Sequence, residues 1–143
     1  MQIKNARGLT LVELLIAIMI TGIIAAIAVP RFSVLIKNHK LMNAARVVWL
    51  DLHRAKMMAI KEGRTMRVDF TATAYNIVRV DTAAVVVSRN ISMDYPNITL
   101  AIIPSVSFGS TGTANGGTVV LHQGPTSSKR FTIALTGRIG QIS

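Results

Sequence analysis

Gly8-Leu9-Thr10-Leu11-Val12-Glu13 opens the apolar stretch that decides the fold of this chain. The stretch continues to Val29, and Glu13 is its only charged residue. At about 1.5 Å of rise per residue, a helix over residues 9–29 spans roughly 30 Å, which is the thickness of the hydrocarbon core of a bilayer. The sequence therefore predicts a membrane-spanning helix at the amino end of the chain.

The charges beside this stretch predict its orientation. Lys4 and Arg7 lie directly before the apolar run, and positive residues next to a membrane span stay on the cytoplasmic side. We therefore expect the rest of the chain to lie outside the cytoplasm, attached to the membrane by a single helix.

Glu13 needs a physical explanation, because a carboxylate at the centre of a membrane helix costs about 2.5–3.5 kcal/mol on insertion scales. In one interpretation, Glu13 lies near the end of the span, about 6 Å below Leu9 by helical rise, so that its side chain reaches the headgroup region. In the other interpretation, Glu13 pairs with a cation supplied by another subunit.

A short basic leader that ends in glycine, followed by an apolar helix with Glu in its fifth position, resembles the type IV prepilin signal. Counted from Leu9, Pro30 stands where these proteins commonly have a helix-kinking proline. The resemblance implies that a prepilin peptidase cuts between Gly8 and Leu9 and methylates the new amino group of Leu9. It also implies that Glu13 neutralises the amino terminus of a neighbouring subunit during filament assembly. Leu9 departs from the usual Phe, which bears on the efficiency of methylation.

Two other interpretations of the stretch remain open. Ala26-Ile27-Ala28 has the spacing of a signal-peptidase site, although a secretory signal has an apolar core of only about 7–15 residues. An ordinary signal anchor without processing is the second, because hydropathy alone does not distinguish it from a prepilin helix.

The composition limits what the rest of the chain can be. Residues 31–143 suit one small domain with a single core. The chain has no cysteine, so neither a disulfide nor a thiolate metal site can form. The net charge is +10, which would fall to +8 for the side chains if Lys4 and Arg7 left with the leader. This excess predicts an anionic partner such as nucleic acid or lipid headgroups, although solubility accounts for part of it.

The pattern after the span predicts an amphipathic helix over residues 30–62. Its apolar positions recur at spacings of three and four, as on one face of a helix; they are Leu41, Ala45, Val48, Leu52, Ala55 and Ala59. Lys61 in the last turn and Gly63 after it indicate the helix end. Pro30 lacks a backbone donor and is expected to kink the helix. We expect Trp49 to lie in the core.

Short segments rich in Val, Ile and Thr follow Gly63 and predict β-strands. They cover residues 65–70, 75–80, 85–91, 98–103, 118–123 and 130–135. A sheet that packs its apolar face on the helix would complete a two-layer α+β core. The expected organisation is a leader (1–8), a membrane helix (9–29), an amphipathic helix (30–62) and a β-sheet head (63–143). The resemblance implies a type IV pilin-like fold, with the long helix packed on an antiparallel sheet.

A second resemblance lies in the carboxyl half. Phe108, Gly112, Asn115-Gly116-Gly117-Thr118 and Gly137-Arg138-Ile139 look like the signature of the GspH/FimT group of minor pilins and pseudopilins. Asn115-Gly116-Gly117 predicts a hairpin turn, because Asn and Gly tolerate positive φ. It does not predict a phosphate-binding loop, since neither a Gly-Lys-Ser/Thr sequence nor a helical pattern follows it.

No catalytic or metal-binding pattern stands out. His39, His53 and His122 are scattered, and no two of them have the i, i+4 spacing of a metal site. Asp51 and His53 are two residues apart on a helix and do not face each other. No serine lies in a Gly-x-Ser-x-Gly elbow. We expect neither an enzyme nor a bound metal or cofactor.

The resemblance implies a minor pseudopilin or minor pilin at or near the tip of a type II secretion pseudopilus or a type IV pilus, supporting protein secretion or pilus assembly. The implied partners are the prepilin peptidase, the other minor subunits, the major subunit and the inner-membrane assembly platform. The implied location is the bacterial inner membrane, with a single span and the head in the periplasm, and then the filament.

An alternative is a FimT-like minor pilin that binds DNA during uptake. Arg138 matches the first arginine of the family's Gly-Arg-x-Arg pattern, whereas Gly140 replaces the second. Lys129-Arg130 would supply positive charge in place of the missing second arginine. Arg64 and Arg67 would extend the patch if the sheet brings them near. The competing interpretation is that all of these are solvated surface charges.

A third hypothesis belongs to another class. The chain would be an anchored or secreted periplasmic protein unrelated to filaments, whose basic surface meets anionic lipid. It predicts that Gly8 is not processed.

Overall fold

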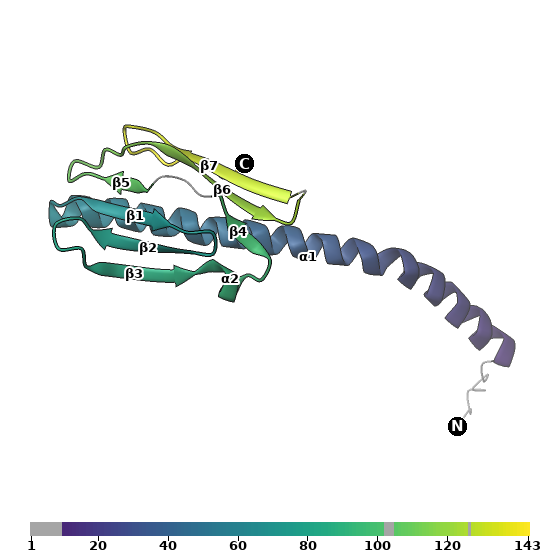
Figure 1. Cartoon of the computed structure of the whole chain (residues 1–143). Coiled ribbons are helices and arrows are strands. Elements are labelled where there is room, and N and C mark those ends of the chain that lie inside the picture. Colours follow the sequence, from purple (N-terminus) through teal and green to yellow (C-terminus); the bar gives the residue numbers. More distant parts are fainter. Residues whose placement is uncertain (1–9, 102–104, 126) are drawn as a thin grey trace, which may run out of the picture. The chain divides into compact units, whose positions relative to one another are not determined.

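The structure is a computed structural model that describes residues 10–101, 105–125 and 127–143, without the side chain of Pro30. The chain forms two compact units, which divide after Ile36. We call the described residues 10–36 the amino unit and residues 37–143 the carboxyl unit. A single helix, α1 (Leu11–Glu62), supplies all of the amino unit except its first residue and also begins the carboxyl unit (Figure 1).

The amino unit is an apolar helix whose side chains are almost all exposed in the single chain. By length and composition it can cross a membrane, in agreement with the span predicted over residues 9–29. Leu9 lies outside the described residues, as do Gly8 and the rest of the leader. The backbone remains helical through Pro30, and the kink predicted there stays a prediction.

In the carboxyl unit, α1 buries the face that its sequence period predicts. The side chains turned toward the core recur every three or four residues and are at most 2% exposed; they are Leu41, Ala44, Ala45, Val48, Leu52, Ala55 and Ala59. The helix ends at Glu62 because Gly63 adopts a φ of 63°. The N–H of Gly63 then bonds to the carbonyl of Ile60, and the N–H of Arg64 bonds to the carbonyl of Ala59. These bonds form a Schellman cap, which glycine favours.

Two antiparallel sheets and a short helix complete the carboxyl unit. The first sheet has the order β3-β2-β1-β5 and the second the order β4-β6-β7. The first contains β1 (Met66–Phe70), β2 (Ala74–Arg79), β3 (Val85–Asn90) and β5 (Val106–Phe108). The second contains β4 (Ile98–Leu100), β6 (Gly117–Gln123) and β7 (Ser127–Ile133), and α2 (Ile91–Asp94) connects β3 to β4.

This arrangement corrects two expectations. The strands divide between two sheets, and the sequence pattern missed β5, a strand of three residues that exists through its pairing with β1. Asn115-Gly116-Gly117 does not form a hairpin, since β5 and β6 on either side of it belong to different sheets. Positive φ was predicted correctly, with 76° at Gly116 and 152° at Gly117.

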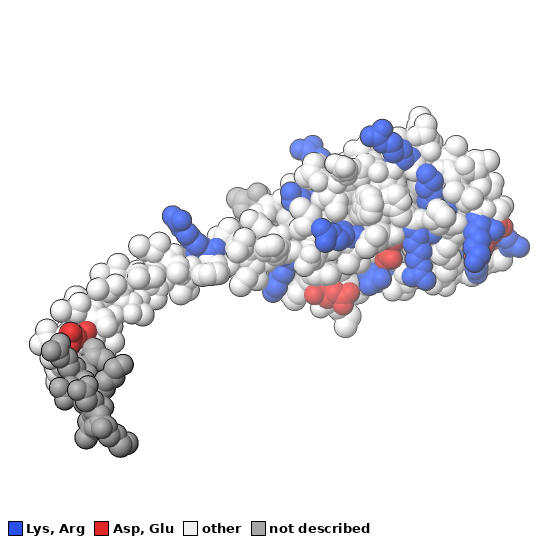
Figure 2. Space-filling model, turned by 180° about the vertical axis from the view of Figure 1, so that it is seen from behind, with Lys and Arg blue, Asp and Glu red and all other residues white. Residues whose placement is uncertain are grey.

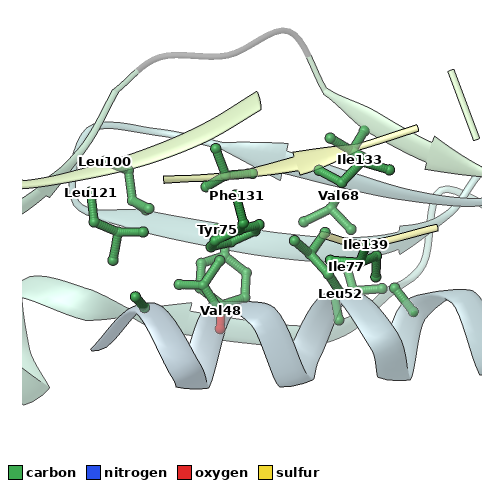
Figure 3. Packing of buried hydrophobic residues seen from close by; sticks show 14 of the residues in the cluster. Val48, Leu52, Val68, Tyr75, Ile77, Leu100, Leu121, Phe131, Ile133 and Ile139 are labelled. Carbon is green, nitrogen blue, oxygen red and sulfur yellow. The ribbon is translucent and has the colours of Figure 1, made fainter. Parts of the chain in front are cut away.

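The core lies between α1 and the inner faces of both sheets. Val48 and Leu52 of α1 belong to one cluster with Tyr75 of the first sheet and with Leu121 and Phe131 of the second sheet (Figure 3). Each large side chain removed from water contributes roughly 1.5–3 kcal/mol. Trp49 is half-buried and packs at the edge of this cluster.

Candidate functional site

The first turn of α1 contains a capping arrangement that involves Glu13. The backbone N–H and the hydroxyl of Thr10 donate to Oε2 of Glu13 over 3.0 and 3.1 Å, and the N–H of Glu13 donates to Oγ1 of Thr10 over 3.2 Å. This is the capping box of a Thr at the N-cap and a Glu three residues later. The sequence signal, Thr10-x-x-Glu13, was present but was not used in the prediction. Among the described residues, no cation pairs with Glu13.

The remaining acidic residues are mostly neutralised within the carboxyl unit. It contains five acidic side chains, and four of them pair with an arginine. The pairs are Asp51 with Arg89, Glu62 with Arg79, Asp69 with Arg67, and Asp81 with Arg64. The two oxygens of Glu62 accept from Nε and Nη2 of Arg79 over 2.7 and 3.0 Å. These hydrogen bonds lower the pKa of Glu62 and raise that of Arg79.

These ion pairs decide which of the predicted DNA-binding cations remain available. Arg64 and Arg67 are each held by a carboxylate, so the structure does not support their joining an anion-binding patch. Lys129 and Arg130 are consecutive on β7 and therefore project to opposite faces of the sheet. Lys129 is half-buried on the side of Phe131, whereas Arg130 is exposed. Arg138 is also exposed.

The segment after β7 pairs with the edge of that strand. Arg130 and Ser143 exchange backbone hydrogen bonds of 3.0 and 2.9 Å, and Gly140 N–H donates to the carbonyl of Thr132 over 2.8 Å. We call residues 138–143 the tail. Arg138 lies beside Ala134, the residue that follows β7. Ala134 is four residues from Arg130, or about 13 Å at 3.3 Å per residue.

The tail is also bound to α1, which no sequence pattern indicated. Nε1 of Trp49 donates to the carbonyl oxygen of Gly140 over 2.8 Å, and Nζ of Lys56 donates to that of Gly137 over 2.9 Å. Gly137 has a φ of 74°, and a Cβ there would overlap the carbonyl oxygen of Gly112. Close backbone packing therefore requires glycine at position 137 of the carboxyl signature.

The three histidines do not form a site. His39 and His122 are exposed, and the ring of His53 stacks on Trp49 with centroids 4.1 Å apart. The Nε2 of His53 is buried and finds no hydrogen-bond partner among the residues that the structure describes. Burial, aided by the charge of Lys56, lowers the pKa of His53. Within the described residues, no group of three His, Cys, Asp or Glu is placed to hold a metal.

A long amino-terminal helix, apolar in its first half and packed on antiparallel sheets in its second, is the fold of the type IV pilin-like proteins. The model of the family "Type II transport protein GspH" matches residues 44–137, and that of the prokaryotic N-terminal methylation motif matches residues 3–29. The chain belongs to the GspH family. It is therefore a pseudopilin or minor pilin, a structural protein and not an enzyme.

Solved structures agree on the fold. Two crystal forms of the type IV minor pilin FimU of Pseudomonas aeruginosa superpose with TM-scores of 0.63 and 0.60. They are 16% and 19% identical to this chain, and the matches cover 74% and 72% of it and 90% and 92% of FimU. At this identity the likeness concerns the fold alone. No curated protein sequence matches the chain.

Proposed function

We propose that this chain is a minor subunit assembled at or near the tip of a type II secretion pseudopilus or a type IV pilus, where it supports secretion or pilus assembly. Before assembly it is anchored in the bacterial inner membrane with the carboxyl unit in the periplasm. Its partners are the prepilin peptidase, which acts at Gly8 and Leu9, the other minor subunits, the major subunit and the assembly platform.

The observation that carries this proposal is the exposed apolar helix of the amino unit with one carboxylate in its first turn. Almost all of its described side chains are exposed to solvent in the single chain. They need a cover, which lipid supplies before assembly and neighbouring helices supply afterwards. Glu13 would then pair with the amino group of a neighbouring subunit.

The capping box allows a test that separates the charge of Glu13 from its role in the helix. Glu13→Gln keeps a side chain that can cap but removes the charge. Thr10→Val removes the cap and keeps the charge. We expect E13Q to insert into the membrane normally and to be lost from isolated filaments, whereas T10V is incorporated. Equal incorporation of E13Q and the parent would refute the pairing.

One observation favours a second function, DNA binding, at a smaller site than the sequence suggested. Arg130 and Arg138 are exposed, and neither has an ion pair within the described parts of the chain. Phosphate contacts make binding salt-dependent. The test is a titration of the full chain with duplex DNA over a range of salt concentrations. A double Arg130→Ala, Arg138→Ala variant should lower both the affinity and the salt slope, while Arg67→Ala should change neither.

A further inference from the structure

The face of α1 that points away from the sheets is an alternation of cations and large apolar side chains. Arg46, Leu50, Arg54, Met57 and Lys61 recur at spacings of four, four, three and four residues and are all exposed. Leu50 is 52% exposed and Met57 62%. We call these five residues the α1 outer face. The outward face of a surface helix usually carries charged and polar side chains, and here Leu50 and Met57 add apolar surface between the cations.

The positive charge of the α1 outer face is not compensated within the carboxyl unit. None of its three cations has an ion pair in the described residues. The two acidic residues that α1 carries in this unit, Asp51 and Glu62, are engaged with Arg89 and Arg79. Figure 2, which looks at the molecule from behind the view of Figure 1, shows lysine and arginine side chains over this side of the carboxyl unit and few acidic ones.

Given the proposed function, on which this step rests, we propose that the α1 outer face docks against an acidic amphipathic helix of a different filament subunit. The spacing specifies the partner. Arg46 and Arg54 are eight residues apart and Arg54 and Lys61 seven, which correspond to about 12 and 10.5 Å of helical rise. A complementary helix presents one carboxylate about every two turns and, between these, an apolar surface for Leu50 and Met57.

Charge argues against a second copy of this chain as the occupant. Four of the five acidic side chains of the carboxyl unit are already paired, and the fifth, Asp94, lies on α2. Two copies would bring cations against cations, and like charges across an interface cost free energy. Nucleic acid is disfavoured because Leu50 and Met57, placed between the cations, would be buried against a phosphate backbone that offers them no apolar contact.

The chain has no cysteine, so single cysteines can map this contact in the full-length protein. Met57→Cys places a thiol on the α1 outer face, and the control Met93→Cys places one on α2 at a methionine that is more exposed, 79% against 62% for Met57. Each variant is co-expressed with one other chain of the host that carries a prepilin-type amino terminus, and membranes are treated with a short bifunctional cross-linker. We expect a cross-linked pair at position 57 with an acidic subunit and little at position 93.

Charge reversal then tests the chemistry. Arg46→Glu combined with Arg54→Glu should reduce cross-linking from position 57 at least tenfold, and the Arg→Lys pair should retain most of it. Arg130→Glu, which reverses an exposed cation on β7, should leave it unchanged. Equal cross-linking at positions 57 and 93, or indifference to the reversal at positions 46 and 54, would overturn the proposal. So would a reversal that abolished binding to DNA or to anionic vesicles and left subunit contacts intact.

Failure of this inference is distinguishable from failure of the proposed function. If the parent chain enters isolated filaments and the reversed variant enters equally well, the subunit role stands and the docking surface is wrong. If the parent chain never enters filaments, the proposed function itself fails.

Discussion

Lys56 of α1 and Gly137, 81 residues later in the chain, are joined by a hydrogen bond of 2.9 Å from Nζ to the carbonyl oxygen. This bond fixes the turn before the tail onto the helix. The conformation of the carboxyl signature therefore depends on a cation of the amphipathic helix.

Replacing Lys56 by Met should keep the apolar stem and remove the hydrogen bond. A hydrogen bond from a charged donor contributes about 1.5–3 kcal/mol, and less where water competes, as it does for this half-buried side chain. We expect urea unfolding to show a loss of about 1 kcal/mol. Lys61 lies further along α1 and has no such bond in the described residues, so Lys61→Met should change the free energy of unfolding very little. An equal decrease in that variant would refute the assignment.

Gly137→Ala should be severely destabilising, because its Cβ would overlap the carbonyl oxygen of Gly112. Gly124→Ala is a matched control. Its φ of 65° is close to the 74° of Gly137, but no atom of the described residues lies within 4 Å of the added Cβ. A left-handed conformation costs a non-glycine residue roughly 1–2 kcal/mol, which both variants share. Thermal unfolding should show a clearly larger decrease in Tm for G137A than for G124A. Equal decreases in the two variants would mean that close packing at Gly137 is irrelevant.

Tyr75, Asp51 and Arg89 form a buried network that joins α1 to the first sheet. The Tyr75 hydroxyl and Arg89 Nε donate to Oδ2 of Asp51 over 2.6 and 2.8 Å, and Asp51 is only 7% exposed. Burial, followed by the bond to Asp51, raises the pKa of Tyr75 far above 10. A raised pKa favours the protonated form in the fold, so its contribution to stability is complete below pH 10 and is lost as the pH rises above that value.

The free energy of unfolding should therefore fall between about pH 9.5 and 11, and Tyr75→Phe should flatten part of that fall. Tyr75→Phe should also cost about 1–3 kcal/mol at neutral pH, since Asp51 loses a donor. An identical slope in the parent and Tyr75→Phe would contradict the network.

The stack of His53 on Trp49 should make the protein sensitive to mild acid. Burial lowers the pKa of His53 below 6.5, so the unfolded chain binds a proton more readily than the folded one. Stability should then decrease as the pH falls below 6.5. We expect His53→Gln to remove part of this dependence when the free energy of unfolding is measured between pH 5 and 7.5, and an unchanged pH dependence in that variant would contradict the assignment.

Local periodicity predicted the elements that depend on neighbouring residues. The buried stripe of α1 and its end at Glu62 follow from spacing and from Gly63, and both were predicted correctly. The short strand β5 and the division into two sheets depend on pairing between distant segments, and they were missed. The predicted basic patch was too large for two reasons. The pairing of β1 with β2 brings Asp81 to Arg64, and the alternation of side chains along β1, which the prediction did not use, places Asp69 on the same face as Arg67. Cleavage after Gly8, methylation of Leu9 and the kink at Pro30 stay predictions.

The capping box at the start of α1 affects the energetics of filament growth. Because Thr10 already donates two hydrogen bonds to the Glu13 carboxylate, that charge carries part of its solvation with it into a lipid environment. Pairing with a neighbour's amino group would then be an exchange of partners, not the capture of a bare ion. The free-energy change of such an exchange is the difference between two similar interactions. We therefore expect the Glu13 contact to contribute only a small favourable free energy to the addition of each subunit, and the addition to be readily reversed.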